Sequence, residues 1–119
     1  MIKNCTLPLL LGAMAVLPVR VEAQTPETTA DVRCVLVGIR AAELPDSPQK
    51  STGLLMALYY IGRLDGRDPT LDLQASLGAQ LSKMTAADFA AEATRCGAGL
   101  TTKGAQIGRI GQDLLKQFK

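Results

Sequence analysis

Residues 47–66 read SPQKSTGLLMALYYIGRLDG, and this stretch decides the fold class. Ser47 followed by Pro48 is a helix start signal, because a serine side chain caps free N–H groups and proline suits the first turn. Apolar residues then recur at helical spacing from Leu54 onward, and Gly66 ends the run. The middle of the stretch is apolar nearly all round, so we expect a helix at the centre of the molecule.

Similar signals lie on both sides of this stretch. Residues 31–43 place valine, leucine and isoleucine on one face of a helix that contains Cys34, with Thr28 or Thr29 as its cap. Asp68 followed by Pro69 predicts the start of a third helix, which carries a leucine stripe.

A fourth helix is predicted to begin at Thr85, because Thr85 and Asp88 form the pattern of a capping box. Gly97 and Gly99 weaken this helix or end it. The apolar residues between positions 107 and 118 then form either a fifth helix or a continuation of the fourth. No stretch shows the alternation typical of a strand, so we expect an all-α fold, a small orthogonal array or bundle of four to five helices closed by one disulfide.

The first 23 residues have the three parts of a cleavable secretory signal peptide. Lys3 is the basic start, an apolar stretch follows over residues 7–19, and Ala23 ends a small-residue exit. The apolar stretch contains two prolines and is shorter than the roughly 20 residues that span a bilayer, which disfavours a membrane anchor. We expect cleavage after Ala23 and a mature protein in the periplasm or outside the cell.

Removal of this segment leaves a mobile leader over residues 24–30 and a single helical domain over residues 31–119. It also removes Cys5, so that two of the three cysteines remain. An even number of cysteines in an exported chain implies a disulfide, and Cys34 with Cys96 is the sole intramolecular pairing. We expect no metal or cofactor, because the chain has no histidine and two thiolates are too few for zinc.

The composition disfavours several classes of function. Positive and negative charges nearly balance, at 13 Lys and Arg against 11 Asp and Glu, and no basic stripe would follow the phosphates of a nucleic acid. The absence of histidine removes nucleophilic catalysis by a serine or cysteine with a histidine base. Asp65, Asp68 and Asp72 fit helix ends better than a calcium or catalytic site. We therefore expect a protein that is not an enzyme and that contacts no membrane after cleavage.

The most distinctive residues lie near the end of the second helix. Tyr59, Arg63 and Arg67 are spaced by four and share one helix face, next to Tyr60. Aromatic and arginine side chains are the usual anchors of protein interfaces, so these four residues are candidates for contact with a protein partner. The alternative is that the tyrosines are half-buried, with their hydroxyl groups at the edge of the core.

Three glycines of the last helix, Gly104, Gly108 and Gly111, lie along roughly one side of it. Small residues at such spacing let a second helix approach closely, as in many helix pairs. A homodimer is one assembly that this pattern would permit.

The layout resembles two families of small exported helical proteins. A cysteine in the first helix, an apolar central helix and Thr85-Ala86-Ala87-Asp88-Phe89 leading to Cys96 and a terminal helix resemble the HdeA-type periplasmic acid-stress chaperones. This resemblance implies a dimer that loosens at low pH and binds unfolded clients. The chain has fewer charged residues than that family.

The second resemblance is to the helical periplasmic immunity proteins of type VI secretion, through Tyr60-Ile61-Gly62 in the central helix. It implies that the protein binds and neutralises a secreted toxin enzyme. The glycine falls one position earlier than in that family. The whole run from Tyr59 to Arg67 is also similar to short exported proteins of Gram-negative bacteria, a likeness that implies no function.

Overall fold

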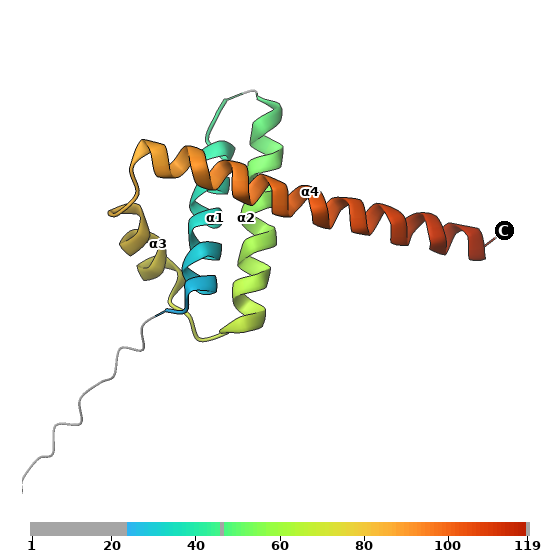
Figure 1. Cartoon of the computed structure of the whole chain (residues 1–119), viewed down its shortest axis with the longest axis horizontal. Coiled ribbons are helices and arrows are strands. Elements are labelled where there is room, and N and C mark those ends of the chain that lie inside the picture. The colour runs from blue at the N-terminus through green and yellow to red at the C-terminus, as the bar shows by residue number, and fades with distance from the viewer. Residues whose placement is uncertain (1–23, 46, 119) are drawn as a thin grey trace, which may run out of the picture.

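Four helices make up most of the described chain: α1 (Pro26–Ala42), α2 (Pro48–Arg67), α3 (Leu73–Leu81) and α4 (Ala86–Gln117), as Figure 1 shows. The structure is a computed structural model that describes residues 24–45 and 47–118, and no strand occurs within these ranges. The prediction of an all-α fold is confirmed, with four helices and not five. The predicted signal peptide, residues 1–23 with cleavage after Ala23, lies outside the described residues.

Helix α1 begins five residues before the predicted start at Asp31. Thr25 is its cap, since the Thr25 hydroxyl accepts the N–H of Thr28 at 3.2 Å, and Pro26 occupies the first turn. Threonine followed by proline is the same start signal that Ser47 and Pro48 give to α2. Residues 26–30, expected to belong to a leader, are therefore helical.

Helices α1 and α2 lie side by side and touch through glycine (Figure 1). A Cβ atom on Gly38 would lie 2.6 Å from the backbone nitrogen of Ala57, and one on Gly53 would lie 2.6 Å from the Gly38 carbonyl oxygen. Real Cβ atoms do not come so close to a backbone. Glycine at both positions is therefore what lets the two helices pack at this short distance.

The core lies between α1, α2 and the first half of α4. It consists of small and medium side chains around one tyrosine, and its buried members are Val32, Cys34, Val35, Val37, Met56, Ala57, Tyr60, Leu64 and Cys96. Helix α1 contributes the most buried residues. The expectation that α2 is central is wrong, because Leu54, Leu55 and Leu58 are 56–60% exposed. An apolar run shows that a helix has more than one apolar face, but not how many neighbours will cover them.

Two aspartates, Asp68 and Asp72, lie in the connection between α2 and α3. Asp72, and not Asp68, caps α3 by accepting the N–H of Ala75 at 2.9 Å. Asp68 follows the end of α2 and accepts the N–H of Thr70 at 3.1 Å. Both carboxylates thus hold backbone groups in the connection between α2 and α3, as expected for residues at helix ends.

Helix α4 begins with the predicted capping box. The Thr85 hydroxyl accepts the N–H of Asp88, and the Asp88 carboxylate accepts the N–H of Thr85 at 2.8 Å. The helix then continues through Gly97 and Gly99 to Gln117, so the predicted fourth and fifth helices are one. Figure 1 shows that its first half crosses α1 and α2 while its second half projects beyond α2. Among the described residues, no helix is apolar over enough of its length to cross a membrane.

Candidate functional site

The predicted disulfide between Cys34 and Cys96 is confirmed, with an S–S distance of 2.01 Å. It joins α1 to α4 across 62 positions of sequence, and both cysteines are fully buried. Arg95 covers its edge, because its guanidinium donates to the Ala30 carbonyl at 2.8 Å and lies 3.1 Å from the Cys34 sulfur. The disulfide therefore fixes the position at which α4 crosses α1.

A carboxylate, Glu92, lies close to both sulfur atoms. Two cysteines and a carboxylate form a ligand set for a metal only when the sulfurs are free thiolates, and here they are bonded to each other. Glu92 accepts from Arg95 at 2.6 Å and lies 3.5 Å from Arg33. Arg33, Glu92 and Arg95 thus form a structural link between α1 and α4.

A buried carboxylate that the sequence analysis did not single out organises the arginines of α2. Asp31 of α1 is 2% exposed, and one of its oxygens lies 3.0 Å from the Arg67 Nη2 and 3.1 Å from the Arg63 Nε. A buried charge is tolerated only with a partner, and here two cations supply it. An aspartate on the apolar face of a helix was the signal that could have revealed this cluster.

The predicted partner-binding residues divide between the core and its surface. Tyr60 is buried, and its hydroxyl donates to the Cys96 carbonyl at 3.1 Å. Burial raises the pKa of Tyr60 above 10.0, since the phenolate would lose its water. Tyr60 therefore joins α2 to α4 and presents no free surface.

Tyr59, Arg63 and Arg67 remain partly accessible. The Arg63 guanidinium lies over both tyrosine rings, 5.8 Å from the Tyr59 centroid and 5.4 Å from that of Tyr60. Partial burial opposes its charge, but the Tyr59 oxygen and the Asp31 carboxylate outweigh this and raise the pKa of Arg63. The side chains of Arg63 and Arg67 are 42% and 33% exposed, so each holds Asp31 with part of its surface in water.

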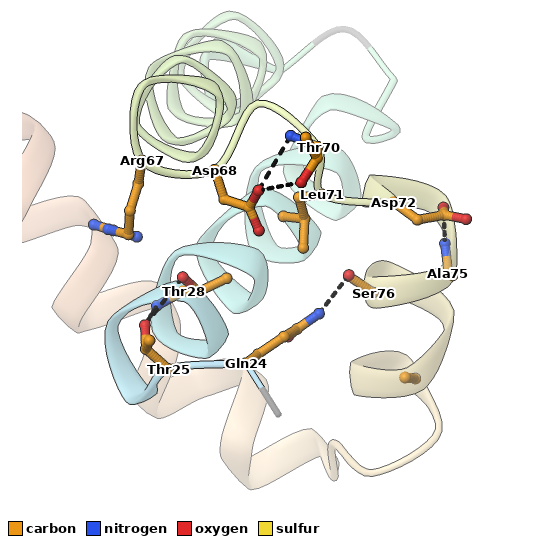
Figure 2. A pocket seen from close by; sticks show the side chains of 11 residues that line it. Gln24, Thr25, Thr28, Arg67, Asp68, Thr70, Leu71, Asp72, Ala75 and Ser76 are labelled. Atoms are coloured by element: carbon orange, nitrogen blue, oxygen red, sulfur yellow. Dashed lines mark hydrogen bonds between the residues drawn. The ribbon is translucent and has the colours of Figure 1, made fainter. Parts of the chain in front are cut away.

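A pocket of about 700 Å³ lies between the start of α1, the α2–α3 connection and α3. Figure 2 shows that the polar side chains around it bond to one another, with Gln24 reaching across to Ser76. Thr25 bonds Thr28, Asp68 bonds Thr70, and Asp72 caps α3. Arg67 extends away from the other labelled side chains, toward Asp31. The polar groups of this pocket thus form hydrogen bonds that hold the turns and helix ends of its walls.

One exposed apolar surface lies on α2. Leu54, Leu55 and Leu58 are exposed, and helical spacing places Tyr59 one turn after Leu55 and Arg63 one turn after Tyr59. We call these five residues the α2 outer surface. It joins exposed leucines to two of the residues that the sequence pattern selected for partner contact.

A second exposed apolar surface lies on the projecting half of α4, which we define as residues 101–117. Ile107, Ile110, Leu114 and Leu115, together with Phe118 just after the helix, are 48–85% exposed. Single exposed apolar residues are common, but several on one helix usually mark an interaction site.

Neither surface can be assigned by likeness to other proteins, since comparisons of the chain with family models, with curated proteins and with solved structures found no match.

Proposed function

We propose that the protein is an exported, non-enzymatic binding protein, and that its α2 outer surface holds a protein partner or the apolar segments of unfolded clients. The observation that carries the proposal is the exposure of Leu54, Leu55 and Leu58 on a helix whose other side is fixed in the core. A rigid helix that presents leucines beside a tyrosine and an arginine has the composition of an interface centre.

The surroundings of this surface support a rigid presentation. Gly53 and Ala57 hold α2 against α1, and Tyr60 holds it against α4. The leucines therefore need no rearrangement to meet a partner, which lowers the entropic cost of binding. The buried disulfide supports export, because disulfides persist in oxidising compartments such as the periplasm or the extracellular space.

Acid would promote client binding by an HdeA-like protein with this charge balance. Lowering the pH protonates carboxylates and leaves the basic side chains unbalanced, so that repulsion loosens the helices. More apolar surface would then become available to clients.

The test compares two double variants in an assay of client aggregation. Leu55→Ser with Leu58→Ser removes apolar area from the α2 outer surface, while Leu44→Ser with Leu81→Ser removes similar exposed area elsewhere. We expect the wild type to suppress aggregation of a denatured model protein at some pH between about 7 and 2, the range over which carboxylates protonate. The α2 variant should lose this activity and the matched control should keep it.

Two results would contradict the proposal. One is a wild type that binds no client at any pH in this range and no protein in a pull-down from periplasm. The other is equal loss in both double variants, which would show that exposed leucines act without regard to position. A tight complex at neutral pH with a secreted toxin enzyme, lost only in the α2 variant, would assign the surface to the immunity-type role.

A further inference from the structure

The apolar face of α4 does not end where the core ends. Phe89 and Leu100 pack against the core and Cys96 lies within it. At 3.6 residues per turn, Ile107, Ile110, Leu114 and Phe118 fall with these three residues in one sector about 80° wide. A single straight stripe thus runs along α4, covered by α1 and α2 in its first half and exposed in its second half.

The exposed part of the stripe is large enough to support a specific interface. With roughly 200 Å² for each large apolar side chain, the exposed fractions of Ile107, Ile110, Leu114 and Phe118 amount to about 500 Å². Two copies paired through this area would bury about 1,000 Å² in total, about the smallest area expected of a specific interface.

Three glycines lie along one edge of the exposed stripe and favour a helix as its occupant. Gly104, Gly108 and Gly111 have open space where a Cβ would lie, and each weakens the helix that contains it. A helix of this length with three glycines is marginal in water without tertiary contacts. The contact between Gly38 and Gly53 shows that this fold uses glycine where two helices touch.

We infer that the projecting half of α4 packs antiparallel against the same half of a second copy of the chain. A twofold axis would place the two stripes face to face, so that each covers the other. In a parallel pair, Lys103, which lies on the same side of α4 as the stripe, would lie beside its equivalent, and the helix dipoles would align unfavourably. The antiparallel arrangement separates the two Lys103 side chains and opposes the helix dipoles.

This dimer does not depend on the proposed function, because the α2 outer surface lies on another helix. The test measures the molar mass of the exported protein by light scattering and sedimentation at several concentrations. The disrupting variant is Ile110→Asp with Leu114→Asp, in the stripe. The matched control is Ala105→Asp with Gln112→Asp, which adds the same two charges to the opposite side of the same helix.

We expect the wild type and the control to show twice the mass of one chain at about 50 µM, in line with an interface of this modest size. The stripe variant should show the mass of a single chain at the same concentration. Helical circular dichroism of the wild type should fall on dilution, as the projecting half loses its partner and frays.

Orientation is tested by cross-linking. In an antiparallel pair centred near Ile110, a cysteine at position 111 faces its equivalent and a cysteine at position 104 does not. We therefore expect Gly111→Cys to form an intermolecular disulfide under mild oxidation and Gly104→Cys to form much less.

The inference is overturned if the wild type has the mass of one chain at all concentrations, or if the stripe variant and its control dimerise equally. A monomeric wild type that binds vesicles of anionic phosphatidylglycerol, with loss of binding in the stripe variant, would overturn it in favour of a membrane surface. Cross-linking of Gly104→Cys as strong as that of Gly111→Cys would overturn the antiparallel arrangement.

Discussion

The two halves of α4 have the same sequence character and opposite surroundings. From Phe89 to Leu100 the apolar side of the helix packs against α1 and α2, with Arg40 over the Phe89 ring at 5.1 Å. From Ile107 to Phe118 the same side is exposed. Periodicity is equal in the two halves, so the difference comes entirely from which neighbours reach the helix. An apolar stripe therefore predicts that a helix face packs against another element, but not whether that element belongs to the same chain.

The largest expected effect removes the covalent link of the packed half. Cys34→Ala with Cys96→Ala should lower the free energy of unfolding by about 4 kcal/mol, because the disulfide closes a long loop in the unfolded chain. Urea unfolding followed by circular dichroism checks this. If the double variant is as stable as the wild type, the contacts of Phe89, Tyr60 and Leu100 alone hold the packed half in place.

The next prediction compares one glycine from each half of α4. Gly99→Ala places a Cβ 2.5 Å from the Tyr60 hydroxyl, which is fixed by its hydrogen bond to Cys96, and should destabilise by about 1–2 kcal/mol. Gly108→Ala meets no atom within 4 Å and should stabilise by up to about 1 kcal/mol through helix propensity.

Urea unfolding of both glycine variants at a concentration where the chain is monomeric gives the comparison. Opposite signs would confirm that the two halves differ in tertiary contact. Destabilisation by Gly108→Ala under these conditions would show that the projecting half packs against its own chain.

The smallest expected effect lies at the start of the packed half. Thr85→Ala removes the cap of α4 and should lower the free energy of unfolding by about 1 kcal/mol at neutral pH. Thr94→Ala, an exposed threonine within the same helix, is the matched control and should change it much less.

This capping effect should depend on pH. The Thr85 N–H and hydroxyl both bond the Asp88 carboxylate and lower the pKa of Asp88 below 3.8. The ionised form is thus favoured in the folded state, and its contribution is present above pH 3.8 and is lost as the pH falls through the lowered pKa. The difference between wild type and Thr85→Ala should therefore shrink in strong acid, and an NMR titration should show a higher pKa of Asp88 in the variant. If the difference in free energy of unfolding between wild type and Thr85→Ala does not change with pH, the Asp88 carboxylate contributes nothing to the cap.

Local sequence signals predicted where the helices begin better than they predicted which helix faces are buried. Ser47 with Pro48 and Thr85 with Asp88 set the starts of α2 and α4, because a cap depends on a few adjacent residues. The disulfide also followed from counting, once Cys5 was assigned to a signal peptide. Thr25 with Pro26 gives the same kind of signal to α1, although the sequence prediction assigns both residues to a mobile leader.

Burial could not be predicted in the same way, since it depends on residues far apart in sequence. The sequence predicts α2 at the centre of the molecule, but α1 packs against the side of α2 that carries Gly53 and Ala57. Among the described residues, no helix covers the other side, so its leucines are exposed. The candidate site changed for the same reason. Tyr60 belongs to the core, and Arg63 and Arg67 are held by Asp31, whose role required knowing that α1 and α2 lie side by side.

The place of the disulfide along α4 also has a mechanical consequence. Cys96 is the last fully buried residue before the helix leaves the body of the molecule, so a covalent bond anchors α4 about a third of the way along its length. A pull on the projecting half would be carried through Cys96 into α1, and through α1 into its close contact with α2.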